Sequence, residues 1–236
     1  MKIHRFYMEN IDISNLVTQE TDFIHQLKNV FRYKPGQIIH VFNEMMGEIE
    51  VEILNFTKKD MSFKFIRQIK TIDDIEHKKR HVTLYMSIIK NSNFDLIVEK
   101  ATELGVSTII PIITERTVKN NLNIERLNKI VKEATEQSGR LDLLKIENTI
   151  SLDELIDSLN KIEGYKVFGS IEGKIDFDYN NAKLSEDISI VIGPEGGFTE
   201  GEISKLVENK ITPICLNKNV LRAETAAIIF CCIYSL

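Results

Sequence analysis

The chain has 236 residues, of which 43% are hydrophobic and 28% charged, and its formal net charge is −5. This composition is typical of an ordinary water-soluble protein with one large domain or two small ones. The negative balance gives no global sign of nucleic-acid binding, although an acidic protein can carry a local basic face. Because no apolar run approaches the length of a membrane span and the first residues lack a signal-peptide core, we expect a cytoplasmic protein without a membrane segment.

Residues 1–72 are predicted to form a small β-rich domain. Apolar and polar residues alternate along two of its three expected strands, which is typical of a half-buried sheet. A charged stretch without apolar periodicity, residues 71–80, is the expected linker. The predicted elements are strands at 38–42, 48–53 and 62–66, turns at Pro35-Gly36 and Met46-Gly47, and one short helix over 21–31.

Residues 73–236 alternate strands with helices, which predicts a mostly parallel sheet covered on both faces. Ligands of such sheets bind beyond the carboxyl ends of the strands. The expected strands are 81–89, 106–113, 165–170, 188–192 and 213–216. The expected helices are one with Phe94, Ile97, Val98, Ala101 and Leu104 inward and Gly105 as its stop, one over 123–138 ended by Gly139, one opened by Ser151 with Glu154, and one over 223–234.

A glycine-rich loop, residues 193–197, follows the apolar strand 188–192 and precedes a helix. Thr199 and Glu202 form the pattern of a capping box, and Phe198 with Ile203 that of a hydrophobic staple. Glycine in such a loop lets a ligand touch bare backbone. The spacing matches neither a dinucleotide fingerprint nor a P-loop, and the carboxylate of Glu195 suits a cation or a hydroxyl-rich group better than an anion. An ordinary turn remains the alternative interpretation.

A second junction of the same kind runs from Leu216 to Arg222 and opens the last helix. Arg222, Glu224 and Thr225 bring charge and hydrogen-bonding groups to the start of an otherwise apolar helix. A solvated cap with Glu224 near the helix dipole is the alternative interpretation. The three cysteines, Cys215, Cys231 and Cys232, form no metal-type pair and predict buried thiols, and the scattered histidines indicate no metal site.

With both loops in view, the chain resembles the RsmE family, uridine-N3 methyltransferases of bacterial small-subunit ribosomal RNA in the SPOUT superfamily. The resemblance covers nearly the whole chain, and the order and spacing of its segments are highly specific. Two departures stand out, because Leu141–Leu144 replaces a stretch that usually contains proline and Asn217 replaces a glycine. The matching segments are His4–Phe6, His25–Gly36, Lys100–Val106, Arg116-Thr117, Glu133–Arg140, Gly193–Phe198 and Leu221–Ala226.

The resemblance implies a PUA-like β-barrel at 1–72 that binds RNA and a trefoil-knotted SPOUT methyltransferase domain at 73–236. It implies S-adenosylmethionine as methyl donor, 16S ribosomal RNA or the small subunit as partner, a homodimer, and no metal. The residues expected to hold the donor are Gly169, Gly193, Pro194, Glu195, Gly196, Gly197, Leu216, Asn217, Val220, Leu221, Thr225 and Ala226.

The acceptor implied by the resemblance, N3 of uridine, is protonated at neutral pH, so transfer needs a base or groups that stabilise charge on the uracil carbonyls. Arg222 is the candidate for charge stabilisation. Glu224 either accepts the proton or orients Arg222, and orientation is the favoured interpretation. The expected RNA contacts are Arg5, Arg32, Lys34, Arg116 and Arg140, with a solvated surface as the alternative for the first three and a partner-subunit contact for the last two. Two alternative functions are a SPOUT enzyme that methylates a ribose hydroxyl or a guanine, and a non-catalytic RNA-binding assembly factor.

Overall fold

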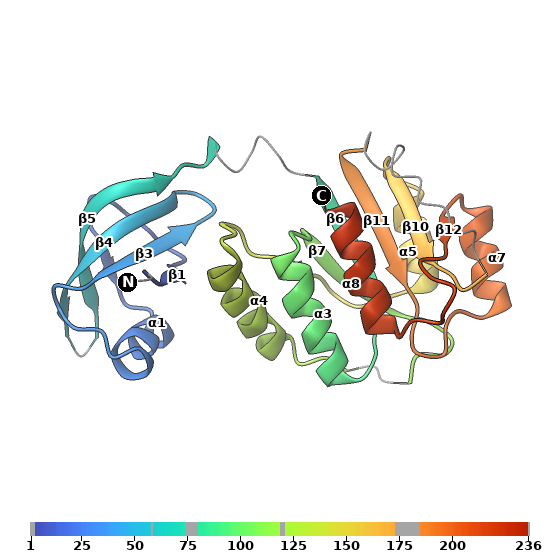
Figure 1. Ribbon diagram of the computed structural model, residues 1–236, viewed down its shortest axis with the longest axis horizontal. Helices are drawn as coiled ribbons and strands as arrows, with labels where there is room; N and C mark the ends of the chain where they lie inside the picture. Colours follow the sequence, from blue (N-terminus) through green and yellow to red (C-terminus); the bar gives the residue numbers. More distant parts are fainter. Residues whose placement is uncertain (1–2, 58, 74–79, 119–120, 173–184, 236) are drawn as a thin grey trace. The chain divides into compact units, whose positions relative to one another are not determined.

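The computed structural model describes residues 3–57, 59–73, 80–118, 121–172 and 185–235. The chain divides into two compact units, one of residues 1–78 with 135–142 and one of residues 79–134 with 143–236 (Figure 1). The sequence pattern gave no sign that 135–142 belongs with the N-terminal unit. Most of the predicted linker, residues 74–79, lies outside the described residues.

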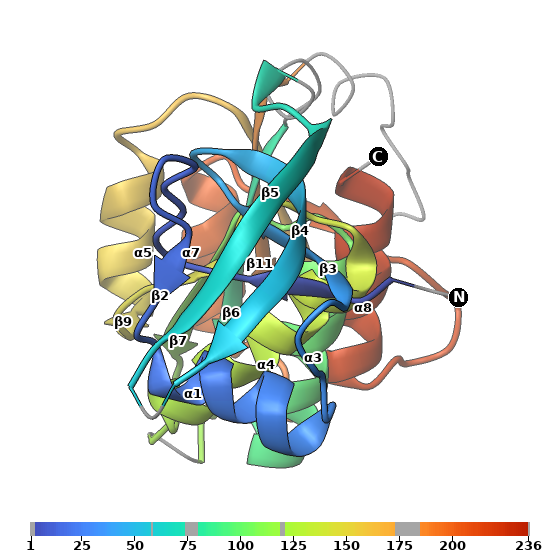
Figure 2. The same cartoon turned by 90° about the vertical axis from the view of Figure 1, so that its left-hand side faces the viewer.

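The first unit is built on a five-stranded sheet in the order β1-β3-β4-β5-β2 (Figure 2). The three predicted strands are present, and the structure adds two short ones, β1 and β2, that hydrophobic alternation did not reveal. β1 runs parallel to β3, and the other neighbours are antiparallel. The strands are β1 Arg5–Tyr7, β2 Val17–Thr18, β3 Ile38–Asn43, β4 Gly47–Phe56 and β5 Met61–Lys70.

The predicted helix of this unit has two parts, an α-helix α1 over Thr21–His25 and a π-helical turn η1 over Gln26–Val30. Phe23 and Leu27 from these turns are fully buried against the sheet residues Phe6 and Ile39. The turn between β3 and β4 requires glycine, since Gly47 has a φ of +74° and a Cβ there would overlap the backbone of β5.

The second unit contains a seven-stranded sheet in which every pairing is parallel. Its strand order is β12-β10-β11-β6-β7-β8, with β9 also pairing with β7. The strands are β6 His81–Ser87, β7 Thr108–Ile113, β8 Lys145–Ile146, β9 Ile150–Ser151, β10 Tyr165–Gly169, β11 Asp187–Ile192 and β12 Thr212–Ile214. The predicted parallel sheet is therefore confirmed.

Helices pack on both faces of this sheet (Figure 1). On strand β6, Leu84 and Met86 join the core formed with α3, α4 and α8, whereas Tyr85 between them joins the core formed with α5 and α7. Such alternation follows from the period of two along a strand. The helices are α3 Asn91–Glu103, α4 Ile124–Ser138, α5 Leu152–Leu159, α7 Glu200–Glu208 and α8 Ala223–Tyr234.

The helix boundaries agree with the local signals in the sequence. Gly105 and Gly139 follow α3 and α4 with φ of +88° and +84°, the left-handed conformation that ends helices. Both predicted capping boxes form, at the starts of α5 and α7. Among the described residues, no helix has the length and apolarity needed to cross a membrane.

The prediction that all three cysteines are buried is wrong for Cys232, which is exposed. Cys231 and Cys232 are neighbours on α8, and consecutive residues of a helix do not share a face. Cys231 lies in the core, where burial raises the pKa of its thiol to about 12. That thiol is therefore protonated and unreactive at neutral pH.

Candidate functional site

Three neighbouring strands of the second unit, β10, β11 and β12, end together at one edge of the sheet. Gly169 at the end of β10 is in register with Ile214 at the end of β12, and Phe168 with Val191 of β11. The N–H of Ser170 donates to the carbonyl of Ile214 at 3.0 Å and extends this pairing past the strand ends. A cavity of about 200 Å³ lies beyond this edge.

The cavity is lined by both loops that the sequence singled out and by the start of α8. Eleven of the twelve predicted donor-binding residues line it, all except Thr225, which is exposed on the first turn of α8. Nine lining residues were not predicted from the sequence. Two of them, Ala223 and Phe230, lie on the same face of α8 as the predicted Ala226, so helical spacing could have identified them. The other missed residues are Ser170, Ile171, Ile192, Phe198, Ile214, Cys215 and Asn219.

The glycine-rich loop is a tight turn in which the N–H of Gly197 donates to the carbonyl of Pro194 at 2.9 Å. Gly197 has a φ of +67°, which explains glycine at that position. A Cβ on Gly193 would lie 3.1 Å from the ring of Phe198, so the loop packs closely on its own staple residue. Bare backbone therefore forms much of this cavity wall.

Glu195 at the tip of the loop connects it to a second element. Its Oε1 accepts the backbone N–H of Lys90 at 3.3 Å, at the start of α3. Glu195 also lines the cavity, so its carboxylate gives this rim a negative charge. Such a rim favours a cationic ligand, as the sequence indicated.

Arg116, from the segment after β7, contacts the same loop. Its Nη1 donates to the carbonyls of Gly196 at 2.7 Å and Phe198 at 3.4 Å. Its side chain also lies flat on the loop, since a Cβ on Gly196 would be 3.3 Å from its Cδ. The sequence suggested an RNA or partner-subunit contact for Arg116, and the structure directs this guanidinium to the loop carbonyls.

The neighbouring residue Glu115 links the same segment to the start of α7. Its N–H donates to Oε1 of Glu202 at 2.8 Å, and its own carboxylate accepts from the hydroxyl of Thr199 at 3.1 Å. Glu202 is buried and also closes the capping box. The glycine-rich loop is therefore fixed at its tip by Lys90 and along its length by Arg116, and the helix that follows it is fixed by Glu115.

The second loop supplies an apolar wall made by Leu216, Val220 and Leu221. Asn217, which replaces the family glycine, does not take a positive φ; only Arg32 and Lys210 do so among the described non-glycine residues. Its side-chain oxygen instead accepts the N–H of Asn219 at 3.1 Å, which closes an Asx turn. The turn thus forms without glycine.

The two catalytic candidates lie at the start of α8, beside the cavity and outside its lining. The side chain of Arg222 is 85% exposed, and its Nη1 lies 4.0 Å from Oε1 of Glu224. The side chain of Glu224 is only 12% exposed. Its Oε2 is buried without a hydrogen-bond partner in the described part of the chain.

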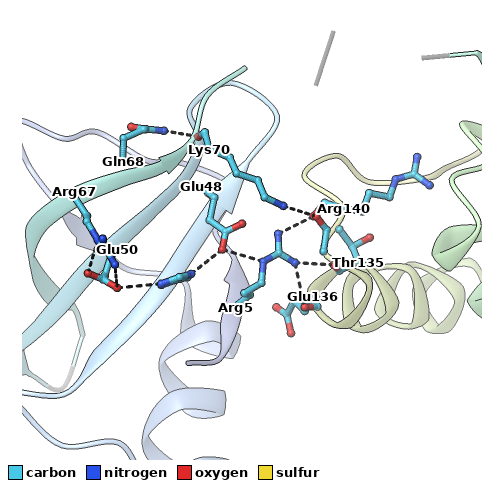
Figure 3. A network of polar contacts seen from close by, with 11 residues as sticks. Arg5, Glu48, Glu50, Arg67, Gln68, Lys70, Thr135, Glu136 and Arg140 are labelled. Carbon is cyan, nitrogen blue, oxygen red and sulfur yellow. Dashed lines mark hydrogen bonds and ion pairs between the residues drawn. The ribbon is translucent and has the colours of Figure 1, made fainter. Parts of the chain in front are cut away.

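Arg5 and Arg140 lie in the first unit, where their guanidinium groups contact other residues of the same unit (Figure 3). Arg5 donates to the Glu48 carboxylate and to the carbonyls of Thr135, Glu136 and Arg140, which places a cation at the C-terminal end of α4. Arg140 pairs with Asp142 at 2.9 Å, and only 8% of its side chain is exposed. Both guanidinium groups are used inside the protein. Arg32 and Lys34, by contrast, are exposed.

Comparison with known proteins gives a consistent result for the whole chain. Residues 76–235 match the model of the RNA methyltransferase domain family. The chain is 35% identical to the ribosomal RNA small subunit methyltransferase E of Rickettsia conorii, over 97% of this chain and 93% of the relative. It is 30% identical to the enzyme of the same name from Aquifex aeolicus, over 96% of each chain.

Solved structures agree with this fold. The ribosomal RNA small subunit methyltransferase E of Neisseria gonorrhoeae, bound to S-adenosyl methionine, is 26% identical, with a TM-score of 0.81 over 98% of this chain and 95% of that one. A structure from Legionella pneumophila superposes with a TM-score of 0.86 over 99% of this chain and 97% of that one, at 22% identity. The second unit, an α/β domain with a cavity at the ends of its parallel strands, is therefore an RNA methyltransferase domain. The chain belongs to the ribosomal RNA small subunit methyltransferase E family.

Proposed function

We propose that this protein transfers a methyl group from S-adenosylmethionine to N3 of a uridine in 16S ribosomal RNA. The observation that carries the proposal is the cavity at the ends of β10, β11 and β12, formed by the two loops that carry the family's motifs. The match to the small subunit methyltransferase E family over nearly the whole chain supports the same activity.

The cavity suits the donor chemically. Leu216, Val220 and Leu221 offer apolar surface for an adenine ring, and the backbone of residues 193–197 offers hydrogen-bonding groups without side chains in the way. The Glu195 carboxylate on the rim favours the positive charge of a sulfonium. The donor supplies an electrophilic methyl group, and this chain's residues bind it, orient it and handle the proton of the acceptor.

The acceptor nitrogen is a weak acid, so the chain must remove its proton or stabilise charge on the uracil ring. The exposed guanidinium of Arg222 is free to reach a nucleotide and stabilise negative charge on a uracil carbonyl. The Oε2 of Glu224 is buried and so cannot contact a bound nucleotide, whereas its Oε1 lies 4.0 Å from the guanidinium of Arg222. We therefore assign charge stabilisation to Arg222 and the orientation of Arg222 to Glu224.

We further propose the architecture that the family implies. The first unit would be a PUA-like barrel that grips RNA through exposed residues such as Arg32 and Lys34. The loops 193–197 and 216–222 would belong to a trefoil knot in the second unit. The enzyme would act as a cytoplasmic homodimer, which sedimentation at several protein concentrations tests directly.

The activity is tested by incubating the purified protein with 16S ribosomal RNA, or with small ribosomal subunits, and labelled S-adenosylmethionine. Digestion to nucleosides and mass spectrometry should reveal N3-methyluridine. Label in a ribose methyl group or in a guanine would assign another acceptor. Donor binding without transfer to either substrate would contradict the proposal.

The roles of the two polar residues are tested by single-turnover rates. Arg222→Ala should lower the rate by at least about 100-fold, as loss of a charge-stabilising donor does in other enzymes. Glu224→Gln keeps an oxygen that accepts from Arg222 but cannot take a proton, so a rate within a few-fold of wild type is expected for a residue that orients Arg222. A loss of about 100-fold or more in Glu224→Gln would instead assign Glu224 as the proton acceptor.

A further inference from the structure

An aromatic cluster lies at the surface of the first unit. The ring of Phe31 is 5.0 Å from that of His4 and 6.2 Å from that of Tyr33, measured between centroids. Tyr33 also places its hydroxyl 2.8 Å from Nδ1 of His4. Below them, the buried ring of Phe6 supports Phe31 edge-on at 5.1 Å.

This cluster is open to solvent although it contains large apolar rings. Phe31 is 38% exposed, and His4 is exposed as well. Val30, next to Phe31, is 63% exposed. A partly exposed ring that is supported from below and lies next to a second ring tilted by only 34° is a surface on which a nucleobase can stack.

The residue between Phe31 and Tyr33 in the sequence is a cation, Arg32. Arg32 has a φ of +57°, a left-handed conformation that helices usually reserve for glycine after their last turn. The N–H of Tyr33 donates to the carbonyl of Leu27 at 2.9 Å and closes this helix end. An arginine is energetically costly at this position, and its guanidinium forms no hydrogen bond or ion pair with the described residues in return. Its exposed charge is therefore available to a ligand.

The segment that contains Phe31 and Tyr33 carries positive charge, which favours an anionic partner. Residues 23–43 contain no Asp or Glu, whereas the whole chain has a net charge of −5. The same stretch contains Lys28, Arg32 and Lys34, all exposed. Aromatic rings next to cations, with no carboxylates nearby in the sequence, suit the binding of single-stranded nucleic acid. The cations can contact its phosphates, and the rings can stack on its unpaired bases.

We infer that Phe31, Tyr33 and His4 form a stacking platform for an unpaired base of the RNA substrate, with Arg32 and Lys34 contacting the flanking phosphates. The inference rests on the proposed function for the identity of its ligand as RNA. It adds a sequence-tolerant base contact to the first unit, separate from the methyl-transfer cavity. Stacking depends little on salt, whereas phosphate contacts depend on it strongly, so the two contributions are separable.

The chain contains no tryptophan, so the variant Phe31→Trp carries a single indole reporter at the platform. The probe is a single-stranded oligouridylate of about 12 nucleotides, with an RNA duplex of equal length as comparison. Stacking should quench the indole fluorescence with the single strand and leave it nearly unchanged with the duplex. Equal responses to both probes would overturn the stacking role.

Affinity measurements with the same oligouridylate provide the second test. Phe31→Leu, which keeps the apolar packing on Phe6, should weaken binding by about 10-fold without changing its salt dependence. Arg32→Ala should lower the slope of log affinity against log salt by about one. Val30→Ala is the matched control, since it truncates the neighbouring exposed apolar side chain, and should bind as wild type does. Wild-type affinity in Phe31→Leu would overturn the inference.

Donor titration and methyl transfer separate this inference from the proposed function. Phe31→Leu should keep the wild-type affinity for S-adenosylmethionine and the wild-type kcat on ribosomal RNA, with a raised KM. If the wild type transfers no methyl group yet its oligouridylate binding depends on Phe31, the platform stands and the proposed activity falls. If transfer is normal and KM is unchanged in Phe31→Leu, the activity stands and the platform falls.

Discussion

Replacing Arg116 by alanine tests how the methyl-donor cavity is held in shape. The wild-type guanidinium makes a short hydrogen bond to the Gly196 carbonyl and a longer one to that of Phe198. A hydrogen bond to a charged group contributes about 1.5–3 kcal/mol, and solvent at this exposed residue reduces the loss to about 1–2 kcal/mol. No described contact places Arg116 in the cavity itself, so its loss acts through the loop.

A loop that leaves its binding conformation weakens apparent affinity in proportion to the lost population. At about 1.4 kcal/mol per tenfold, Arg116→Ala should raise the Kd for S-adenosylmethionine by about 5- to 30-fold. Isothermal titration calorimetry measures this, with Arg116→Lys expected between the variant and wild type because lysine restores one donor. Arg126→Ala is the control, since that exposed arginine pairs with Asp95 on the neighbouring helix. A Kd for Arg116→Ala within twofold of wild type would show that the hydrogen bonds of Arg116 to the loop do not hold the cavity in shape.

Three further outcomes follow from the described contacts. Glu202→Ala removes the buried carboxylate of the α7 capping box and should lower the unfolding free energy by about 1–2 kcal/mol, measured by urea denaturation. Gly169→Ala places a methyl group 3.2 Å from a side-chain carbon of β11 at the cavity wall, so calorimetry should show weaker donor binding. Burial raises the pKa of Glu48, but hydrogen bonds from Arg5 and His40 outweigh it and hold that pKa below its usual 4.5. Stability from this group is therefore present above pH 4.5 and lost as the pH falls below it, and Glu48→Gln should flatten that loss in thermal melts from pH 6 to 3.5.

The two loops that line the cavity could be predicted from the sequence because their signals are local. The run of residues 193–197 combines a strand end, glycines and a capping box, and each of these signals is local. The parallel order of the strands then brings the second loop to the same edge. Thr225 does not line the cavity because it lies on a different face of the helix from Ala223, Ala226 and Phe230, and the helical spacing of these three residues indicates that face.

The contacts of the arginines could not be predicted from the sequence in the same way. Arg5 bonds to the carbonyl of Arg140, and Arg116 to that of Gly196, so their partners lie far along the chain. A long side chain carries no sequence signal of whether it ends in solvent or on a carbonyl. The placement of residues 135–142 in the first unit has the same cause, since it depends on these contacts and on the bond from the N–H of Tyr7 to the Glu136 carboxylate.

These contacts divide the basic residues by function in a way that charge alone does not. An arginine whose donors are satisfied by carbonyls or a carboxylate, as in Arg5, has little left to offer a phosphate. Arg32 offers its whole guanidinium, in a backbone conformation that favours glycine. If Arg5 nevertheless contacted RNA, Arg5→Gln, which removes the charge, would lower the salt dependence of RNA binding as Arg32→Ala does. We expect Arg5→Gln instead to lower stability and leave the salt slope unchanged, because the donors of Arg5 are bound to the Glu48 carboxylate and to backbone carbonyls.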